Sequence, residues 1–203
     1  ESYGKPLIFV DSNTLYLGHS CVTTDLEDSV ITALEYFLDH GHKEIGLLVG
    51  QEETADATPL QMDPRQRTFQ QYLTEKGLYE ERFVSVGQFS TESGYQLMEQ
   101  LIQALGDDLP TAFFMASDAL AVGALRSLQE HQIAVPDRVS LISFNDTSIA
   151  KYVFPALSTV TVYTEEMGKQ AIQMLRQTFQ GAQPSVPYMV KLATKLTIRD
   201  SSR

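Results

Sequence analysis

Three apolar segments of this sequence end in polar residues suited to binding a ligand. Asp11 closes the segment LIFVD, Ser117 and Asp118 close TAFFMASD, and Asn145 and Asp146 close LISFND. Carboxylates accept hydrogen bonds, and an asparagine amide both donates and accepts them, so these groups suit the hydroxyls of a polar ligand. Asp and Asn are also common in turns, which leaves both interpretations open for Asp11 and Asn145. For Asp118, which directly precedes a helical pattern, a role as helix cap is favoured.

Recognisable catalytic and cofactor motifs are absent from the sequence. It lacks the phosphate-binding pattern G-x-x-x-x-G-K-[ST], the dinucleotide pattern G-x-G-x-x-G and the nucleophile elbow G-x-S-x-G. The four histidines follow no metal-ligand spacing, and Cys21 alone cannot anchor a zinc site. Glu165 and Glu166 open a helical pattern, where carboxylates complement the helix dipole. We therefore expect no enzyme, metal centre or cofactor.

The composition is that of an ordinary globular protein with an acidic surface. Of 203 residues, 43% are hydrophobic and 20% are charged, and the formal net charge is −11. Such a charge repels phosphate backbones, so this chain alone is a poor candidate for binding DNA. The single Cys21 excludes an internal disulfide and fits a reducing compartment. Because no signal-peptide pattern and no bilayer-length apolar run is present, we expect a cytoplasmic chain away from membranes.

The polar residues need a sheet to bring them together, and the sequence predicts its strands and helices. Short apolar runs bounded by turn residues predict strands, and helical spacing of apolar residues between capping signals predicts helices. The predicted strands are 7–10, 44–50, 83–86, 111–118, 139–146, 158–162 and 188–198, and the predicted helices are 26–38, 65–76, 91–105, 119–131 and 165–180. Alternating strands and helices indicate a parallel sheet covered on both faces. At its carboxyl edge the polar residues would converge.

The order of these motifs resembles the effector domain of LacI/GalR-type bacterial transcription repressors. The stretch TAFFMASDALAVGALRSLQEHQIAVPDRVSLISFNDTSIAKYVFPALSTV carries most of the likeness. DHGHKEIGLLVG is similar to the family's GH-x-x-I strand entry, and ALSTVTV to its P-x-L-T-T-V crossover. The likeness extends from Pro6 to about Arg199, and a series of motifs in the right order is more specific than any one of them.

The resemblance implies an α/β fold of the periplasmic-binding-protein-like type I, a parallel-sheet sandwich in two lobes. The C-terminal lobe would be essentially complete and the N-terminal lobe partial, and the DNA-reading helix-turn-helix would lie outside this stretch. Residues 1–20 would be a remnant of the N-terminal lobe, residues 21–157 the C-terminal lobe, residues 158–182 a crossover segment of the N-terminal lobe, and residues 185–203 the closing strand and tail of the C-terminal lobe.

Members of this family bind a small effector, usually a sugar, in the cleft between the lobes. By resemblance, Asp11 accepts hydrogen bonds from ligand hydroxyls, and Arg65 reaches the effector from a helix start, with Arg67 as a nearby competitor for this role. Phe89 matches an aromatic residue that packs against the ligand, as suits the apolar face of a pyranose. Plain core packing is the alternative for Phe89.

Three positions depart from the family pattern. Thr68 stands where the family usually has glycine, Ser117 where several sugar-binding members have asparagine, and Asn145 where most have aspartate. An ionised aspartate only accepts hydrogen bonds, whereas neutral Asn145 accepts one and donates another. Ser117 and Asn145 complete the effector contacts that the resemblance implies. The FNDT form of the motif is associated with galactose- or β-galactoside-responsive members, so we expect a galactose-type effector.

The implied function is the sensing of a sugar and the dimerisation of a bacterial transcriptional repressor. Sugar binding would favour an allosteric state whose DNA-binding heads no longer hold the operator. We expect a homodimer that meets operator DNA only through the helix-turn-helix. The alternative is the sugar-binding component of a transport system, which would carry an export signal. A hydrolase or transferase using Asp11 and Asp146 as acid and base lacks an evident nucleophile.

Overall fold

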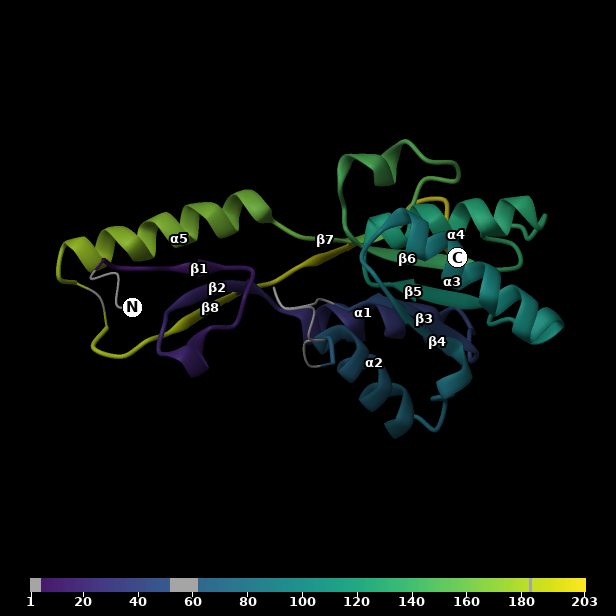
Figure 1. Cartoon of the computed structure of the whole chain (residues 1–203), viewed down its shortest axis with the longest axis horizontal. Helices are drawn as coiled ribbons and strands as arrows, with labels where there is room; N and C mark the ends of the chain where they lie inside the picture. Colours follow the sequence, from purple (N-terminus) through teal and green to yellow (C-terminus); the bar gives the residue numbers. More distant parts are fainter. Residues whose placement is uncertain (1–4, 52–61, 183) are drawn as a thin grey trace. The chain divides into compact units, whose positions relative to one another are not determined.

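The computed structural model describes residues 5–51, 62–182 and 184–203 and divides the chain into two compact units. Unit 1 comprises Glu1–Asp25 and Val162–Thr194, and unit 2 comprises Leu26–Thr161 and Lys195–Arg203. Both units are built from parallel strands and helices (Figure 1). The predicted α/β class is confirmed.

Unit 2 is built on a six-stranded sheet in the order β4-β3-β5-β6-β7-β9. Neighbouring strands are parallel except for β9, which runs antiparallel to β7. Every residue of β3 and β5 is buried, as expected for central strands covered on both faces. The strands are β3 (Ile45–Gly50), β4 (Val84–Gly87), β5 (Ala112–Met115), β6 (Ser140–Asn145), β7 (Ser158–Thr161) and β9 (Lys195–Thr197).

Four helices cover the two faces of this sheet. The helices α1 (Leu26–Asp39) and α2 (Pro64–Glu75) pack together on one face, and α3 (Thr91–Leu105) and α4 (Asp118–Glu130) pack together on the other (Figure 1). Short 3-10 turns occur at Leu15–Leu17, Glu81–Phe83, Gly106–Asp108 and Ser148–Lys151.

Two glycines let α3 and α4 approach until their backbones touch. A Cβ atom at Gly94 would lie 2.2 Å from the carbonyl oxygen of Leu120, and one at Gly123 would lie 2.0 Å from that of Thr91. Backbone atoms cannot yield to such a clash, so these positions require glycine. The close contact fixes the N-terminal parts of both helices, and with them the loops that precede α3 and α4.

Unit 1 is a smaller sheet covered by one long helix. Its strands β1 (Phe9–Val10), β2 (Cys21–Thr24) and β8 (Met189–Leu192) are parallel and lie in the order β1-β2-β8. The helix α5 (Thr164–Phe179) packs on this sheet through Met167, Ala171 and Met174, which bury Val22.

The strand pairing corrects the predicted lobe boundaries. The second lobe was expected to begin at residue 21, but Cys21–Thr24 pairs with β1 and β8 in unit 1. Residues 158–182 were expected to form one crossover segment, but Ser158–Thr161 belongs to the unit 2 sheet and the chain enters unit 1 at Val162. The expected closing strand 188–198 is two strands, because β8 pairs in unit 1 and β9 in unit 2.

Candidate functional site

The candidate site lies at the carboxyl edge of the unit 2 sheet, meaning the described residues at and just beyond the ends of β3, β4, β5 and β6. From β3 the chain moves outward to β4, and from β5 it moves in the opposite direction through β6 and β7. The strand order therefore reverses between the neighbouring strands β3 and β5. Open α/β sheets bind ligands outside the carboxyl ends of their strands at such a reversal point.

Arg65 lies at this reversal point, held from two directions. It is the second residue of α2, the helix reached from β3, and its Nη1 donates a hydrogen bond of 2.7 Å to the carbonyl oxygen of Ala116 beyond β5. The side chain is only 12% exposed. Arg67 is exposed on the same helix. Of the two candidates, Arg65 is the arginine whose guanidinium reaches the edge.

Two aromatic rings lie against the guanidinium of Arg65. Its Cζ atom lies 4.8 Å from the ring centroid of Phe89, in the loop after β4, and 5.2 Å from that of Phe144, near the end of β6. A cation over an aromatic face is attracted by the ring quadrupole. Phe89 also packs on Gly50, where a Cβ atom would lie 2.4 Å from its Cγ. Phe89 therefore packs on protein groups and stands beside the predicted effector contact Arg65.

Asp63, which the sequence analysis did not single out, orients Arg65. As N-cap of α2 it accepts a hydrogen bond from the backbone N–H of Arg65 at 2.8 Å. Its two carboxylate oxygens also accept from Nε at 2.9 Å and from Nη2 at 2.7 Å, a bidentate ion pair. The sequence signal for this cap was available, because Asp followed by Pro64 at the first helical position is typical of a helix start.

Ser117 lies beside Ala116 and begins α4. Its Oγ accepts a hydrogen bond from the backbone N–H of Leu120 at 3.2 Å, so Ser117 is the N-cap of this helix. The favoured interpretation of Asp118 as the cap is therefore wrong. Ser117 as a residue is 6% exposed. Its hydroxyl oxygen accepts the cap hydrogen bond, and the hydroxyl proton can still be donated.

Asn145 ends β6 in an unusual backbone conformation. It is exposed, with φ of 111°, and the next residue, Asp146, has φ of 57°. Non-glycine residues with positive φ are uncommon, and Asn and Asp adopt such values more readily than most. Asn145 thus ends β6 directly after Phe144, whose ring lies against the guanidinium of Arg65.

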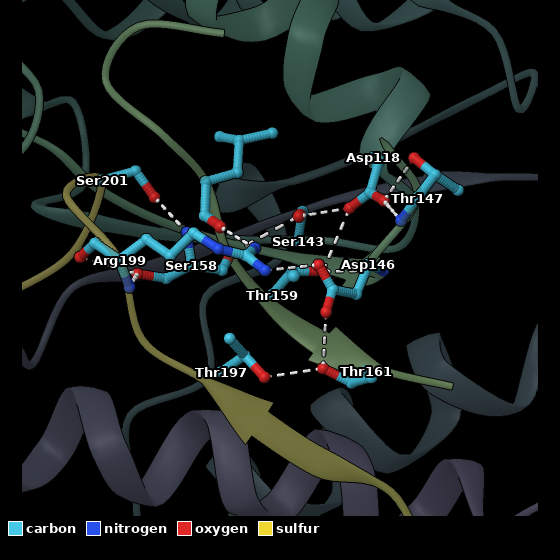
Figure 2. Close-up of polar contacts among 11 residues, drawn as sticks. Asp118, Ser143, Asp146, Thr147, Ser158, Thr159, Thr161, Thr197, Arg199 and Ser201 are labelled. Carbon is cyan, nitrogen blue, oxygen red and sulfur yellow. Dashed lines mark hydrogen bonds and ion pairs between the residues drawn. The ribbon is translucent and has the colours of Figure 1, made fainter. Parts of the chain in front are cut away.

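The buried carboxylate of Asp118 is hydrogen bonded to residues on either side of Asn145 along the chain (Figure 2). It is 2% exposed and accepts hydrogen bonds from the hydroxyls of Ser143 at 2.5 Å and Thr159 at 3.0 Å. Thr147 donates to it twice, from the backbone N–H at 2.6 Å and from Oγ1 at 2.7 Å. Asp118 therefore joins the start of α4 to β6, β7 and the loop after Asn145.

The neighbouring carboxylate of Asp146 ties the same loop to the C-terminal strand (Figure 2). It accepts from Nη2 of Arg199 at 2.7 Å and from the hydroxyl of Thr161 at 2.8 Å, and its own N–H donates to Thr159 at 3.3 Å. Thr161 and Thr197 are also hydrogen bonded, at 2.6 Å. We call these contacts of Asp118 and Asp146 the aspartate brace. They hold Asn145 in place.

Asp11, the fifth predicted contact, belongs to unit 1. It follows β1 with φ of 61°, and its N–H donates to the carbonyl oxygen of Val22 at 2.9 Å. It is exposed. The other four predicted contacts lie in unit 2, on four separate segments at one edge of its sheet: Arg65, Phe89, Ser117 and Asn145.

The carboxyl edge offers hydrogen-bonding groups beside aromatic rings. In the described part of the chain, no three His, Cys, Asp or Glu side chains gather as metal ligands. No helix within 5–51, 62–182 and 184–203 is long and apolar enough to cross a membrane. Amide, hydroxyl and guanidinium groups next to aromatic faces suit recognition of a polyhydroxylated ligand.

Comparison with known proteins shows which family and which regulators the chain is similar to. Residues 34–202 match the family model described as a periplasmic binding protein-like domain. The HTH-type transcriptional regulator GalR of Streptococcus thermophilus is 52% identical over 203 residues, which are 100% of this chain and 61% of that regulator. The HTH-type transcriptional regulator GanR of Bacillus subtilis is 37% identical over 96% of this chain and 59% of its own length.

Solved structures share the fold. The structure of the transcriptional regulator CelR in complex with cellobiose superposes with a TM-score of 0.82 at 26% identity, over 98% of this chain and 59% of that one. The chain thus spans about three fifths of the length of the regulators it matches.

Proposed function

The chain belongs to the periplasmic binding protein-like domain family and, within it, to the LacI/GalR-type regulators. From this we propose that it is the effector-sensing part of a sugar-responsive transcriptional repressor. The observation that carries the proposal is the packing of Phe89 and Phe144 on the guanidinium of Arg65, at the sheet edge where Ser117 and Asn145 also lie. These residues come from four separate segments of the chain. Such an arrangement favours a binding site over four independent turns.

In the proposed site, each residue has a distinct part in binding a saccharide. Arg65 donates hydrogen bonds to ligand oxygens, and Asn145 accepts from one hydroxyl and donates to another. Ser117 donates its hydroxyl proton, and Phe89 offers a ring edge or face to the C–H groups of a pyranose. Asp11, in unit 1, stays a prediction from the sequence resemblance.

The proposed mechanism is a shift between two states of the repressor. A sugar that binds one state better than the other raises the population of that state. If that state holds operator DNA less tightly, DNA must by linkage weaken sugar binding by the same factor. Because this mechanism makes and breaks no covalent bond, we propose a regulator rather than an enzyme. A regulator that binds operator DNA would act in the bacterial cytoplasm.

We propose a galactose-type sugar as the effector. The sequence similarity to regulators named GalR supports this choice, as does the FNDT motif that contains Asn145. A neutral amide at this position pairs with a hydroxyl as donor or acceptor, which suits a neutral sugar.

A thermal-shift screen of the full-length protein tests the proposed effector class. D-galactose, lactose, melibiose and D-glucose at millimolar concentration are compared with D-ribose and adenine. A ligand that binds only the folded state raises the melting temperature, so we expect a rise with one or more galactosides and none with adenine. A rise with adenine alone would reject a saccharide effector.

We also propose that the protein acts as a homodimer. The loop after Asn145 presents Tyr152 and Phe154, whose exposures are 83% and 85%, beside the half-exposed Ile149. The loop is held on α4, because Gln129 donates to the carbonyl oxygen of Phe154 at 2.6 Å. Large apolar side chains gathered on one ordered loop mark a surface for association, and a second copy of this chain is the proposed occupant.

A further inference from the structure

We propose that Asp63 makes the site selective for neutral sugars and against anionic ones such as sugar phosphates and sugar acids. The inference deepens the proposed function, because it concerns the charge class that the same site accepts. It starts from Arg65, the residue that would otherwise attract an anion.

Asp63 uses both of its carboxylate oxygens on the guanidinium of Arg65. The contacts are 2.9 Å at Nε and 2.7 Å at Nη2, and both side chains are 12% exposed. A bidentate pair shielded from water interacts more strongly than one on the surface. The positive charge that a phosphate or carboxylate would seek is therefore already neutralised within the protein.

The guanidinium is also prevented from turning toward an incoming anion. Nη1 is held by the carbonyl oxygen of Ala116, and the rings of Phe89 and Phe144 lie against Cζ at 4.8 and 5.2 Å. Of the five N–H groups of arginine, these contacts use one each on Nε, Nη1 and Nη2. The two that remain, one on each Nη, can serve single acceptors such as sugar hydroxyls.

The other charges at this edge add to the discrimination. Arg199 is paired with Asp146 at 2.7 Å, as Arg65 is with Asp63. Asp118 is buried and is held by hydroxyl and N–H donors from Ser143, Thr147 and Thr159. Among these described side chains, two arginine charges thus stand against three aspartate charges. The one carboxylate charge left over disfavours an anionic ligand and acts far less on a neutral one.

The Asp63→Asn substitution removes the charge and keeps the helix cap. Asn is as good an N-cap residue as Asp, so its side-chain oxygen can still accept from the backbone N–H of Arg65. The amide, however, offers one acceptor atom where the carboxylate offered two, and its NH2 group cannot accept from Nη2. The variant therefore leaves Arg65 as an uncompensated cation at the site.

Calorimetric titration of the full-length protein with D-galactose and D-galactose 6-phosphate tests the proposal. We expect the wild type to prefer galactose, and Asp63→Asn to gain affinity for galactose 6-phosphate by about tenfold, the effect of freeing one charged partner. Affinity for galactose should change much less. The melting curve of the variant shows whether the fold is kept.

A matched control is the Asp137→Asn variant. Asp137 pairs with Arg203 at 2.6 Å on the surface of the same unit, so this change alters the net charge equally away from the site. We expect it to leave both affinities unchanged. An equal gain of phosphate-sugar affinity in this control would assign the effect to overall charge and overturn the proposal.

The outcomes separate this inference from the proposed effector. The role of Asp63 is overturned if the wild type binds galactose 6-phosphate more tightly than galactose. It is also overturned if Asp63→Asn gains no affinity for galactose 6-phosphate. If wild type binds neither sugar and Asp63→Asn binds galactose 6-phosphate, the galactose proposal fails while the role of Asp63 stands.

Discussion

At the scale of single residues, Asn145 is constrained by its backbone as well as by its amide. Asn145 has a φ of 111° and Asp146 a φ of 57°, so two successive residues have backbone conformations that are strained for most side chains. The aspartate brace holds this turn, with Asp146 bonded to Arg199 and Thr161. A substitution at this position therefore has to be chosen so that the backbone is not disturbed together with the ligand contact.

We predict that Asn145→Gly lowers galactose affinity by about tenfold, the cost of losing one or two hydrogen bonds. Glycine adopts positive φ without strain, so the melting temperature should stay near that of the wild type. Asn145→Ala should lose the same affinity and also some stability. Titration calorimetry and thermal melting of the three proteins measure both effects, and unchanged affinity in Asn145→Gly would remove this residue from the site.

A second prediction concerns Phe89. Phe89→Ala removes the ring beside the guanidinium and the contact with Gly50, so we expect galactose to bind at least several-fold more weakly. Phe179→Ala, which removes an exposed aromatic ring of unit 1, serves as control and should bind normally. Equal affinities of Phe89→Ala and wild type, measured by calorimetry, would restrict Phe89 to core packing.

At the scale of elements, the local signals of the sequence located most helices to within a residue or two. The helix predicted at 91–105 is α3, Thr91–Leu105, and Ser90 is its N-cap. The helix predicted at 165–180 is α5, Thr164–Phe179. These elements could be predicted because a cap and an apolar stripe are written in neighbouring residues.

The elements that escaped prediction depend on distant partners. The strand β2 has the sequence CVTT, which has only two apolar residues and is a strand because β1 and β8 flank it. The run 188–198 looks like one strand, since no breaker marks the passage from β8 to β9. In the site, Ser117 and Asn145 were predicted from strand ends, whereas Arg65 and Phe89 were predicted from the family resemblance alone. The pairing of Asp63 with Arg65 requires knowing how the arginine side chain folds back.

The aspartate brace gives a prediction at this scale. Asp118→Ala removes the common acceptor of Ser143, Thr147 and Thr159, and we expect a loss of about 2–4 kcal/mol in the free energy of unfolding. Ser117→Ala loses only a helix cap and should cost about 1 kcal/mol. Chemical denaturation of both variants measures the difference. If the two losses are alike, the brace does not stabilise the edge in the way described.

At the scale of the whole molecule, the chain passes between the two units at three places, after Asp25, Thr161 and Thr194. Thr161 is the last residue of unit 2 before one of these passages, and its hydroxyl is bonded to Asp146, next to Asn145. Asn145, the proposed ligand contact, is thus connected to this passage through Asp146 and Thr161. In the proposed repressor, a change of backbone at this passage would therefore act on residues in contact with the proposed sugar site.

The proposed dimer is also tested at this scale. Tyr152→Asp places a charge among the exposed side chains of Ile149 and Phe154, so a second copy could no longer bury them without desolvating it. We predict a shift from dimer to monomer in analytical ultracentrifugation of the full-length protein. Tyr16→Asp, at an equally exposed tyrosine of unit 1, is the comparison variant. A dimer that survives Tyr152→Asp would exclude this loop as the interface.

The most direct test of the account is operator release measured by fluorescence anisotropy. Full-length wild type and Asn145→Gly are bound to labelled operator DNA from the gene's own promoter and titrated with D-galactose. We predict equal operator affinity without sugar, a fall in anisotropy for the wild type, and a response of Asn145→Gly that needs about tenfold more galactose. If both proteins respond at the same galactose concentration, the carboxyl edge of unit 2 is not where the effector is sensed.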